Sequence, residues 1–348
     1  MKKNLVVIGY GGMGGWHTQH ALTSDCVNLA GVYDILPEKN ELARSRGIFA
    51  YDSFEAVLAD PAVDLITIAV PNDFHKEIAV AALNAGKNVI SEKPVTLSSV
   101  DLTEMIEAAR KNHRIFSVHQ NRRWDVDFLA MKKIYDSGEL GEVFTIESRI
   151  HGSRGIPSDW RGEKEHGGGM LYDWGVHLVD QILQIIKEDI KTVYCRFEHL
   201  TNDEVDDGFK LVLTFESGKE AYVEVGTYNF IAMPRFYMRA KDGTAMISDW
   251  REKCKLVRCK YWHESDVIPV QTAAGLTKTM APRDSVTVDE YEMERPASDV
   301  HDYYRNFCKA IDGAETQLVT HDEMMKVMRV MEECFRSVEL GQVVEFHL

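Results

Sequence analysis

Several features that would set this chain apart from ordinary soluble globular proteins are missing from its sequence. The six cysteines are scattered and form no CxxC pair, which argues against a disulfide framework and predicts reduced thiols in a cytoplasmic protein. No run approaches the roughly 18 apolar residues of a membrane span. The apolar stretch at residues 5–8 is too short for a signal peptide, and a glycine loop interrupts it.

Positive charge is also scarce. The 40 lysines and arginines are outnumbered by 55 acidic residues, so the formal net charge is -15. Such a surface repels phosphate backbones and anionic lipids, and we therefore expect neither nucleic acid nor a membrane as a partner.

The length of 348 residues predicts two domains, because one hydrophobic core seldom serves so long a chain. We expect the first at residues 1–121 and the second at 122–348. In the first, helical patterns alternate with short apolar runs at 5–8, 27–33, 64–70, 88–91 and 115–119. This alternation predicts an α/β fold with a doubly wound, parallel Rossmann-type sheet.

The second part is richer in strand patterns. Several alternating runs between residues 143 and 240 are separated by short turn signals, which is typical of an antiparallel sheet. Two helical patterns close the chain, and this terminal segment could pack back on the first domain. Cys254, Cys259 and His263 could be imagined as metal ligands, but we expect ordinary strand residues because a fourth ligand is missing. Residues 271–283 read as a loop, either a lid or an intersubunit arm.

The glycine loop after the first expected strand matches the pattern G-x-G-x-x-G. Because it follows a strand and opens a helix, the pattern predicts a dinucleotide site. The first glycine permits the tight turn, the second lets a pyrophosphate approach the backbone, and the third allows close packing of helix against strand. The loop residues expected to contact the cofactor are Gly9, Gly11, Gly12, Met13 and Gly14.

Asp34 lies 20 residues beyond Gly14, at the end of the second expected strand. A carboxylate there accepts hydrogen bonds from the adenosine ribose hydroxyls and repels a 2′-phosphate. The residues that follow, Ile35, Leu36 and Pro37, offer no arginine to bind such a phosphate. The cofactor is therefore expected to be NAD rather than NADP. The alternative is a sharp turn followed by a surface aspartate.

Three further segments resemble the Gfo/Idh/MocA family of nicotinamide-dependent sugar and cyclitol oxidoreductases, the group that includes inositol dehydrogenases. They are AVPNDFH at 69–75, Glu92-Lys93-Pro94 after the fourth strand, and PSDWRGEKEHGGGMLYDWGVHLVD at 157–180. The likeness extends over essentially the whole chain. It implies a second α/β domain around a large open, mainly antiparallel sheet and a cis peptide bond before Pro94. It also implies cofactor contacts from Pro71, Asn72, His75, Glu92 and Lys93.

Lys93, Asp173 and His177 are the expected catalytic residues. Lys93 follows a parallel strand at its carboxyl end, where its ammonium could stabilise negative charge on a substrate oxygen. Asp173 and His177 are four residues apart on one expected helix face, so they could be metal ligands, polar groups satisfied in the core, or a catalytic pair. Because no third ligand is marked, we expect no metal. A neutral histidine can take a hydroxyl proton, with Asp173 orienting the imidazole or binding a neighbouring hydroxyl. The resemblance places the same three residues around the reacting carbinol.

Candidate substrate contacts are less specific. Asn121 and Arg122 follow the fifth expected strand, although Arg122 or Arg123 could instead serve a structural ion pair. Trp160 could face a sugar ring or simply pack in the interior. The glycines at 167–169 would let the backbone approach the substrate closely.

These observations predict an NAD-dependent oxidoreductase that acts on a secondary alcohol of a sugar, inositol or glycoside. One alternative is a glycosidase-type cycle of oxidation, elimination and reduction with retained NAD. Another is an NAD-binding regulatory protein without catalysis. We expect a homodimer or homotetramer formed through the C-terminal sheet, because an uncovered sheet face would expose apolar surface.

Overall fold

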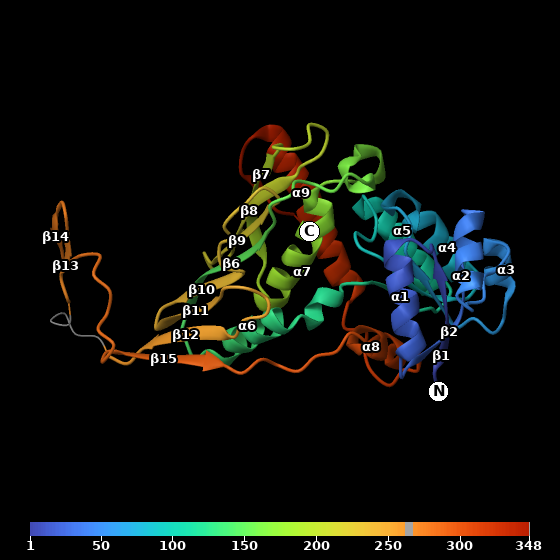
Figure 1. Cartoon of the computed structure of the whole chain (residues 1–348), viewed down its shortest axis with the longest axis horizontal. Helices are drawn as coiled ribbons and strands as arrows, with labels where there is room; N and C mark the ends of the chain where they lie inside the picture. The colour runs from blue at the N-terminus through green and yellow to red at the C-terminus, as the bar shows by residue number, and fades with distance from the viewer. Residues whose placement is uncertain (262–266, 348) are drawn as a thin grey trace.

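The computed structural model describes residues 1–261 and 267–347, which form two parts around two separate sheets (Figure 1). The first sheet has five strands in the order β2-β1-β3-β4-β5, and every pair is parallel. Its strands are β1 (Lys3–Ile8), β2 (Val27–Tyr33), β3 (Leu65–Ile68), β4 (Asn88–Ser91) and β5 (Phe116–Val118). The helices between and after them are α1 (Gly12–Thr23), α2 (Pro37–Ser45), α3 (Phe54–Ala59), α4 (His75–Asn84) and α5 (Ser99–Lys111). Every residue of β3 and β4 is buried, which fits a sheet covered on both faces and confirms the predicted doubly wound domain.

The second sheet has nine strands in the order β15-β12-β11-β10-β6-β9-β8-β7-β16. β6 and β9 pair in parallel and the other pairs are antiparallel, as the mainly antiparallel prediction requires. The strands are β6 (Val143–His151), β7 (Ile190–Glu198), β8 (Gly208–Phe215), β9 (Glu220–Gly226), β10 (Phe236–Ala240), β11 (Gly243–Ile247), β12 (Cys254–Cys259), β15 (Val288–Met293) and β16 (Val344–Glu345). The short edge strand β16 carries too few residues to show an alternating pattern.

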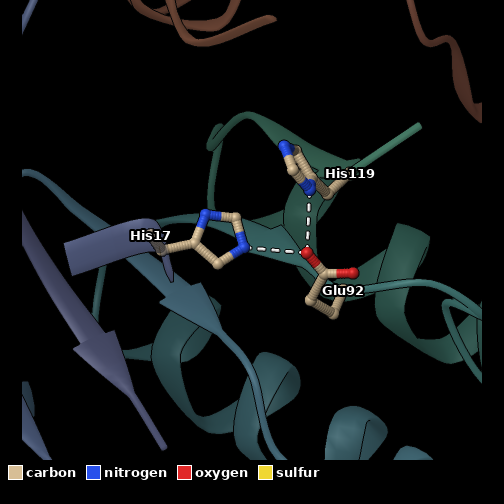
Figure 2. A group of neighbouring side chains, drawn as sticks. All are labelled: His17, Glu92 and His119. Carbon is tan, nitrogen blue, oxygen red and sulfur yellow. Dashed lines mark hydrogen bonds and ion pairs between the residues drawn. The ribbon is translucent and has the colours of Figure 1, made fainter. Parts of the chain in front are cut away.

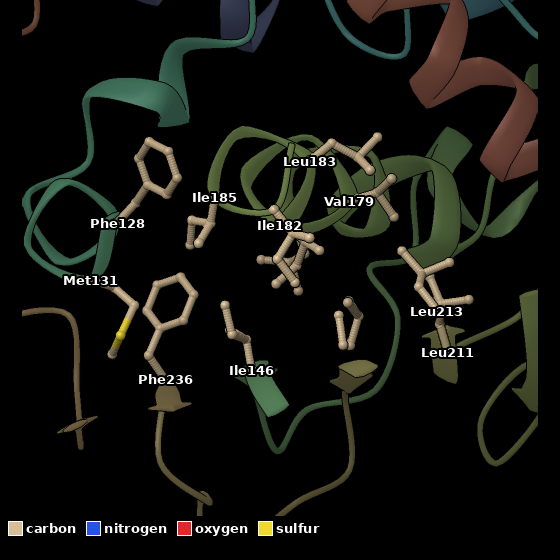
Figure 3. Close-up of a cluster of buried hydrophobic side chains, with 14 of the residues drawn as sticks. Phe128, Met131, Ile146, Val179, Ile182, Leu183, Ile185, Leu211, Leu213 and Phe236 are labelled. Carbon is tan, nitrogen blue, oxygen red and sulfur yellow. The ribbon is translucent and has the colours of Figure 1, made fainter. Parts of the chain in front are cut away.

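One face of this sheet is covered by helices α6 (Val126–Ser137), α7 (Val176–Ile185) and α9 (His321–Leu340) (Figure 1). Alternate residues of the strands point into this layer, as the sequence pattern predicts. Ile182 of α7, Ile146 of β6 and Leu211 of β8 belong to the resulting core, which is drawn in Figure 3.

The end of the chain returns to the first part. Helix α8 (Asp302–Ile311) contributes Tyr303, Tyr304 and Phe307 to the core of the parallel sheet. α9 serves both cores, because Met328 faces the first and Met331 the second. The two sheets are thus joined by shared packing as well as by the chain that crosses between them.

Between β12 and β15 the chain leaves the sheet and reaches outward to a two-stranded hairpin, β13 (Val270–Thr272) and β14 (Gly275–Thr277) (Figure 1). Cys254 and Cys259 are the first and last residues of β12, so both are strand residues as expected, while His263 lies outside the described residues. Within 1–261 and 267–347, none of the helices has the length and apolar character needed to cross a bilayer.

Candidate active site

The glycine loop joins β1 to α1, and its glycines fall into two groups. Cβ atoms added to Gly9 and Gly14 would lie 2.4 Å from the carbonyl oxygen of Ala69 and 1.8 Å from that of Gly9, respectively. Cβ atoms added to Gly11 and Gly12 would meet nothing within 4 Å. Packing therefore explains the first group only. The second group leaves open space at the N-terminus of α1, where free backbone N–H groups favour an anion. Met13 is exposed on the same turn.

Asp34 follows β2 and lines a cavity of about 590 Å³ together with the glycine loop and Pro71. Its carboxylate accepts hydrogen bonds from the backbone N–H groups of Tyr10 at 2.6 Å and Leu36 at 2.9 Å. These bonds hold the carboxylate at the mouth of the glycine loop, the place where a ribose would be recognised.

Asn72 and His75 contact backbone carbonyls. The Asn72 amide donates to two carbonyl oxygens of the loop at 166–167, at 3.2 and 3.3 Å, and so ties the first part to the second. The ring nitrogens of His75 lie 3.0 Å from the carbonyl oxygens of Pro94 and Val70, and the side chain is completely buried. The family likeness implied cofactor contacts for both residues. Their side chains hold the backbone near the cavity, and the cofactor contacts remain a prediction.

Glu92 lies in a buried hydrogen-bond network with two histidines (Figure 2). Its Oε1 accepts from Nε2 of His17 and from Nδ1 of His119, both at 2.8 Å, while Oε2 accepts from the backbone N–H of Lys93 at 3.1 Å. Nδ1 of His17 is bonded in turn to the Tyr304 hydroxyl at 2.9 Å. Although burial opposes ionisation, His119 and His17 hold the pKa of the Glu92 carboxyl well below its usual range. The Glu92 carboxylate is thus hydrogen-bonded inside the protein, and its expected contact with the cofactor remains a prediction.

This network is also the place where candidate metal ligands meet. Within the described part of the chain, His17, Glu92 and His119 form the one group of at least three such ligand atoms that lie within 4.8 Å of one another. Because Oε1 of Glu92 is the shared acceptor of two imidazole N–H groups, we assign the three side chains to hydrogen bonding.

Lys93 and Asp173 meet across the two parts. The ammonium of Lys93 donates to Oδ1 of Asp173 at 2.7 Å and to its backbone carbonyl at 2.8 Å. Arg161 approaches the other carboxylate oxygen at 3.3 Å. Burial acts against the charge, but Lys93 and Arg161 together lower the pKa of Asp173. The peptide bond between Lys93 and Pro94 is cis, as the family likeness implied.

His177 lies at the start of α7 and is 4% exposed. Its Nδ1 donates to Oε1 of Gln120 at 3.0 Å, and the Gln120 amide donates to the carbonyl oxygen of Val176 at 3.4 Å. This arrangement puts the proton of the neutral ring on Nδ1 and leaves a lone pair on Nε2. Burial, with the positive charges of Lys93 and Arg122, holds the pKa of His177 well below its ordinary value. The imidazole is therefore a neutral proton acceptor at neutral pH.

Of the two roles expected for Asp173, the structure does not show the one in which it orients the imidazole of His177. Asp173 lies in a π-helical turn, Leu171–Gly175, that precedes α7. Its carboxylate faces Lys93 and Arg161, and Gln120 orients the imidazole in its place. A spacing of four residues left the direction of each side chain open, because the partners come from distant parts of the chain.

The glycines at 167–169 have a structural reason different from the expected approach of substrate. Cβ atoms added to them would lie 2.3 Å from the Leu97 side chain, 2.3 Å from the Arg161 carbonyl oxygen and 2.2 Å from the Asp206 carboxyl, respectively. Asp206 also accepts a 2.8 Å hydrogen bond from the backbone N–H of Leu171 at the start of the π turn. Close internal packing therefore explains these glycines.

A group of aromatic side chains borders the site beside His177. The Arg122 guanidinium lies 4.2 Å from the Trp174 ring centroid and 5.7 Å from that of Trp250. Arg122 and Trp250 also line a neighbouring cavity of about 400 Å³, together with Asn121. Arg122 has a structural partner as well, since it pairs with Asp125 at 2.9 Å.

Trp160 precedes Arg161, the residue that pairs with Asp173. Its ring contacts the guanidinium of Arg161, whose Cζ is 4.5 Å from the ring centroid. Trp160 thus reaches the site through Arg161. Arg123 is confirmed as structural, because it is buried in ion pairs with Asp180 and Glu323.

Comparisons with known proteins agree with this geometry. The family described as oxidoreductase with an NAD-binding Rossmann fold matches residues 3–120, and the Gfo/Idh/MocA C-terminal domain matches residues 128–246. The chain belongs to the Gfo/Idh/MocA oxidoreductase family.

Members of the Gfo/Idh/MocA family resemble this chain to different extents. A solved NAD-binding protein from Listeria innocua is 43% identical, covers 99% of both chains and has a TM-score of 0.95. The scyllo-inositol 2-dehydrogenase (NADP(+)) of Bacillus subtilis is 28% identical over 81% of this chain and 79% of its own length. An uncharacterized oxidoreductase of Schizosaccharomyces pombe is 37% identical over 48% of this chain. The match spans about half of that relative's length, at 47%.

The residues of this Gfo/Idh/MocA member fit the dinucleotide that its family binds. Gly11 and Gly12 leave room at the N-terminus of α1, and Asp34 presents a carboxylate to the adjoining cavity. Gly9 and Pro71 would border the same molecule. A bound dinucleotide supplies a nicotinamide that can accept or return a hydride.

Sequence reasoning missed three residues of this site. Gln120 stands directly before the candidate Asn121, and Arg161 directly after Trp160, so both were next to a marked position. Trp250 carried no signal at all, because it reaches Arg122 only through the fold of the second sheet.

Proposed function

We propose that the protein is an NAD-dependent dehydrogenase that transfers a hydride between the nicotinamide and a secondary alcohol of a polyol, inositol, sugar or glycoside. The observation that carries this proposal is a buried histidine whose ring is oriented by Gln120 and whose pKa is lowered by burial and by the nearby charge of Lys93. Lys93 follows the end of β4, and His177 lies at the start of α7.

His177 is the proposed general base. Its Nε2 accepts the hydroxyl proton of the substrate, while Gln120 holds the Nδ1 proton and fixes the ring. The lowered pKa keeps this nitrogen unprotonated before the reaction, and the proton returns to the substrate oxygen in the reverse direction.

Lys93 is the proposed electrostatic catalyst. Its ammonium stabilises the negative charge that grows on the substrate oxygen as the proton leaves. Asp173 accepts two hydrogen bonds from Lys93 and so fixes the position of the ammonium. The backbone N–H of Lys93 is held from the other side by Glu92.

The surroundings favour a neutral, hydroxyl-rich substrate. The carboxylate of Asp173 already balances Lys93 and lies beside Arg161, so the group offers both donors and acceptors. The indoles of Trp174 and Trp250 provide apolar faces of the kind on which a sugar ring can lie. The Bacillus subtilis relative is a scyllo-inositol 2-dehydrogenase, which supports a cyclic polyol as substrate.

NAD is the proposed cofactor, although that relative is named for NADP(+). The Asp34 carboxylate lines the cavity in which the adenosine ribose would lie. A 2′-phosphate would meet this negative charge directly, which disfavours NADP.

We further propose that the chain assembles into a homodimer or homotetramer. The face of the nine-stranded sheet that lies away from α6, α7 and α9 carries half-exposed Tyr222 and Tyr237. Association of two such faces would bury them. Light scattering of the purified protein measures the outcome, and a monomer at micromolar concentration would contradict it.

The test of the function is turnover of purified variants with a panel of inositols, aldoses, sugar acids and glucosides. Lys93→Met and His177→Ala should each lower kcat at least about 100-fold while NAD binding stays within about threefold. Lys191→Met on β7 and His199→Ala are the matched controls and should leave kcat unchanged. Normal turnover in Lys93→Met and His177→Ala would refute the proposal. Product formation without net NADH would indicate retained cofactor instead.

A further inference from the structure

Two cysteines meet where α8 packs against the first domain. Cys26 precedes β2 and is half-buried, whereas Cys308 lies on α8 and is buried. Sγ of Cys308 donates to the backbone carbonyl oxygen of Cys26 at 3.6 Å, and the two side chains interact. The two residues are 282 positions apart in the chain, so this contact depends on the folded structure.

The surroundings of Cys26 favour a reactive thiolate. The Cys308 thiol lies beside its side chain, Ser24 places a hydroxyl 3.3 Å from its sulfur, and Arg305 adds a nearby positive charge. Against the effect of burial, these groups lower the pKa of Cys26 to about 7. Cys308 has the opposite character, because its hydrogen bond to Cys26 and its burial raise its pKa. A partly exposed, readily ionised sulfur beside a second thiol is the arrangement found at oxidation-sensitive sites.

We propose that Cys26 and Cys308 form an oxidisable dithiol that closes to a disulfide when the protein meets a peroxide. This site is separate from the proposed hydride-transfer chemistry and does not depend on it. Cys26, as the more exposed sulfur, reacts first, and Cys308 resolves the product.

The reaction balances in two steps. One peroxide oxygen is transferred to the Cys26 sulfur, the O–O bond breaks, and the other oxygen leaves as water, which gives a sulfenic acid. The Cys308 sulfur then attacks, an S–S bond forms, the S–O bond breaks, and a second water departs with the Cys308 proton. Two electrons pass from the pair of thiols to one hydrogen peroxide.

The bond would tether α8 to the domain that carries the glycine loop. α8 also carries Tyr304, which is bonded to His17 in the buried network. Arg305 and Asp25 form an ion pair at 2.9 Å across the same seam. Oxidation would therefore make this junction covalent.

A second pair of cysteines supplies an internal control. The side chains of Cys195 on β7 and Cys334 on α9 also interact, but both are buried, at 1% and 0% exposure. Burial also raises the pKa of Cys334 well above its ordinary value. The two cysteines are neighbours in both pairs. Only the first pair contains a sulfur that is partly exposed and readily ionised.

The experiment treats the reduced, full-length protein with hydrogen peroxide under native conditions, blocks the remaining thiols and digests with trypsin. Mass spectrometry should find the peptide 4–39 joined to the peptide 306–309, in a product that dithiothreitol reverses. The link should be lost in Cys26→Ser and Cys308→Ser and kept in Cys195→Ser. The peptides 192–196 and 330–336 should remain unlinked.

Three outcomes would overturn the proposal. They are free, alkylatable Cys26 after peroxide treatment, over-oxidised Cys26 without a link to Cys308, and equally fast linking of the buried control pair. Because the first measurement uses the wild-type chain, a folding defect in Cys308→Ser leaves the test intact. Circular dichroism of each variant identifies such a defect.

Discussion

Nδ1 of His177 donates a 3.0 Å hydrogen bond to the side-chain oxygen of Gln120. Gln120 follows β5 in the first part, whereas His177 begins α7 in the second. The residue that fixes the proposed base therefore comes from the cofactor-binding part of the chain.

Replacing Gln120 by alanine should lower kcat by about 10- to 100-fold, because the imidazole loses the partner that keeps its proton on Nδ1. The dissociation constant for NAD should stay within about threefold. Steady-state kinetics and calorimetric titration measure the two quantities. Gln184→Ala removes a side-chain amide from α7, the helix that carries His177, and should have little effect on kcat. Equal losses in both variants would contradict the positioning role.

The Arg122→Gln variant should show a changed pH profile. Arg122 lowers the pKa of His177, so its removal should raise that pKa toward the ordinary value. The base works unprotonated, and therefore the acid limb of kcat/KM should move to higher pH. Normalising each profile to its plateau separates this shift from any loss of contact with Trp174. Arg196→Gln on β7 is the control, and superimposable profiles of Arg122→Gln and wild type would refute the coupling.

Alanine substitutions at Gly14 and Gly12 of the glycine loop should affect different properties, the first stability and the second NAD binding. Gly14→Ala should destabilise the protein without cofactor by at least about 2 kcal/mol, because the new Cβ would lie 1.8 Å from a backbone oxygen. Gly12→Ala should leave the thermal midpoint nearly unchanged but weaken NAD binding at least about tenfold, since its Cβ enters only the open space kept for the phosphates. Thermal unfolding and NAD titration are both required. Unweakened binding in Gly12→Ala would place the dinucleotide elsewhere.

The Asp34→Asn variant tests the cofactor preference. It keeps a side-chain oxygen for the backbone N–H of Leu36 or Tyr10 but removes the charge. The ratio of kcat/KM with NAD to that with NADP should fall at least about tenfold, because the repulsion of a 2′-phosphate is lost. Asp52→Asn, at an exposed carboxylate paired with Arg44, should keep the wild-type ratio. An unchanged ratio in Asp34→Asn would argue against this role.

Asp206 should make stability depend on pH. Burial raises the pKa of Asp206 to about 8 in the folded protein, so between about pH 4 and 8 the folded state binds a proton that the unfolded state has released. Its contribution to stability is thus present at low pH and lost as pH rises toward 8. Asp206→Asn, which stays neutral and can accept from Leu171, should be more stable than wild type at pH 9 by on the order of 3 kcal/mol.

Chemical denaturation at pH 5 and pH 9 measures this difference. Asp203→Asn, at an exposed position in the same loop, should follow wild type at both values. A gain for Asp206→Asn that is equal at pH 5 and pH 9 would contradict the assignment.

The local pattern of apolar and polar residues was enough to predict the architecture of the molecule. The buried strands β1 to β5 are short apolar runs beside helical patterns, and their alternation leaves few topologies other than a doubly wound sheet. The positions of Lys93 and Asp34 followed from the same logic, because both stand just beyond the carboxyl end of a parallel strand.

Contacts between distant segments could not be predicted in this way. The spacing of Asp173 and His177 indicated a shared face, but their partners, Lys93 and Gln120, are brought in by the packing of one part against the other. The glycines at 167–169 had a flexible appearance in the sequence, whereas the Asp206 carboxyl and other packed groups leave no room for side chains there. Side-chain direction and crowding are properties of the tertiary structure.

Asn72 links the two parts of the chain beside the proposed active site. Asn72 follows Pro71, which borders the cavity beside the glycine loop. Its amide donates hydrogen bonds to the loop at 166–167, which lies between Arg161 and Asp173 in the chain. If binding of the cofactor changes these hydrogen bonds and thereby the affinity for the alcohol, the alcohol must change the affinity for the cofactor by the same factor. The Asn72 amide would then couple the binding of the cofactor to the binding of the alcohol.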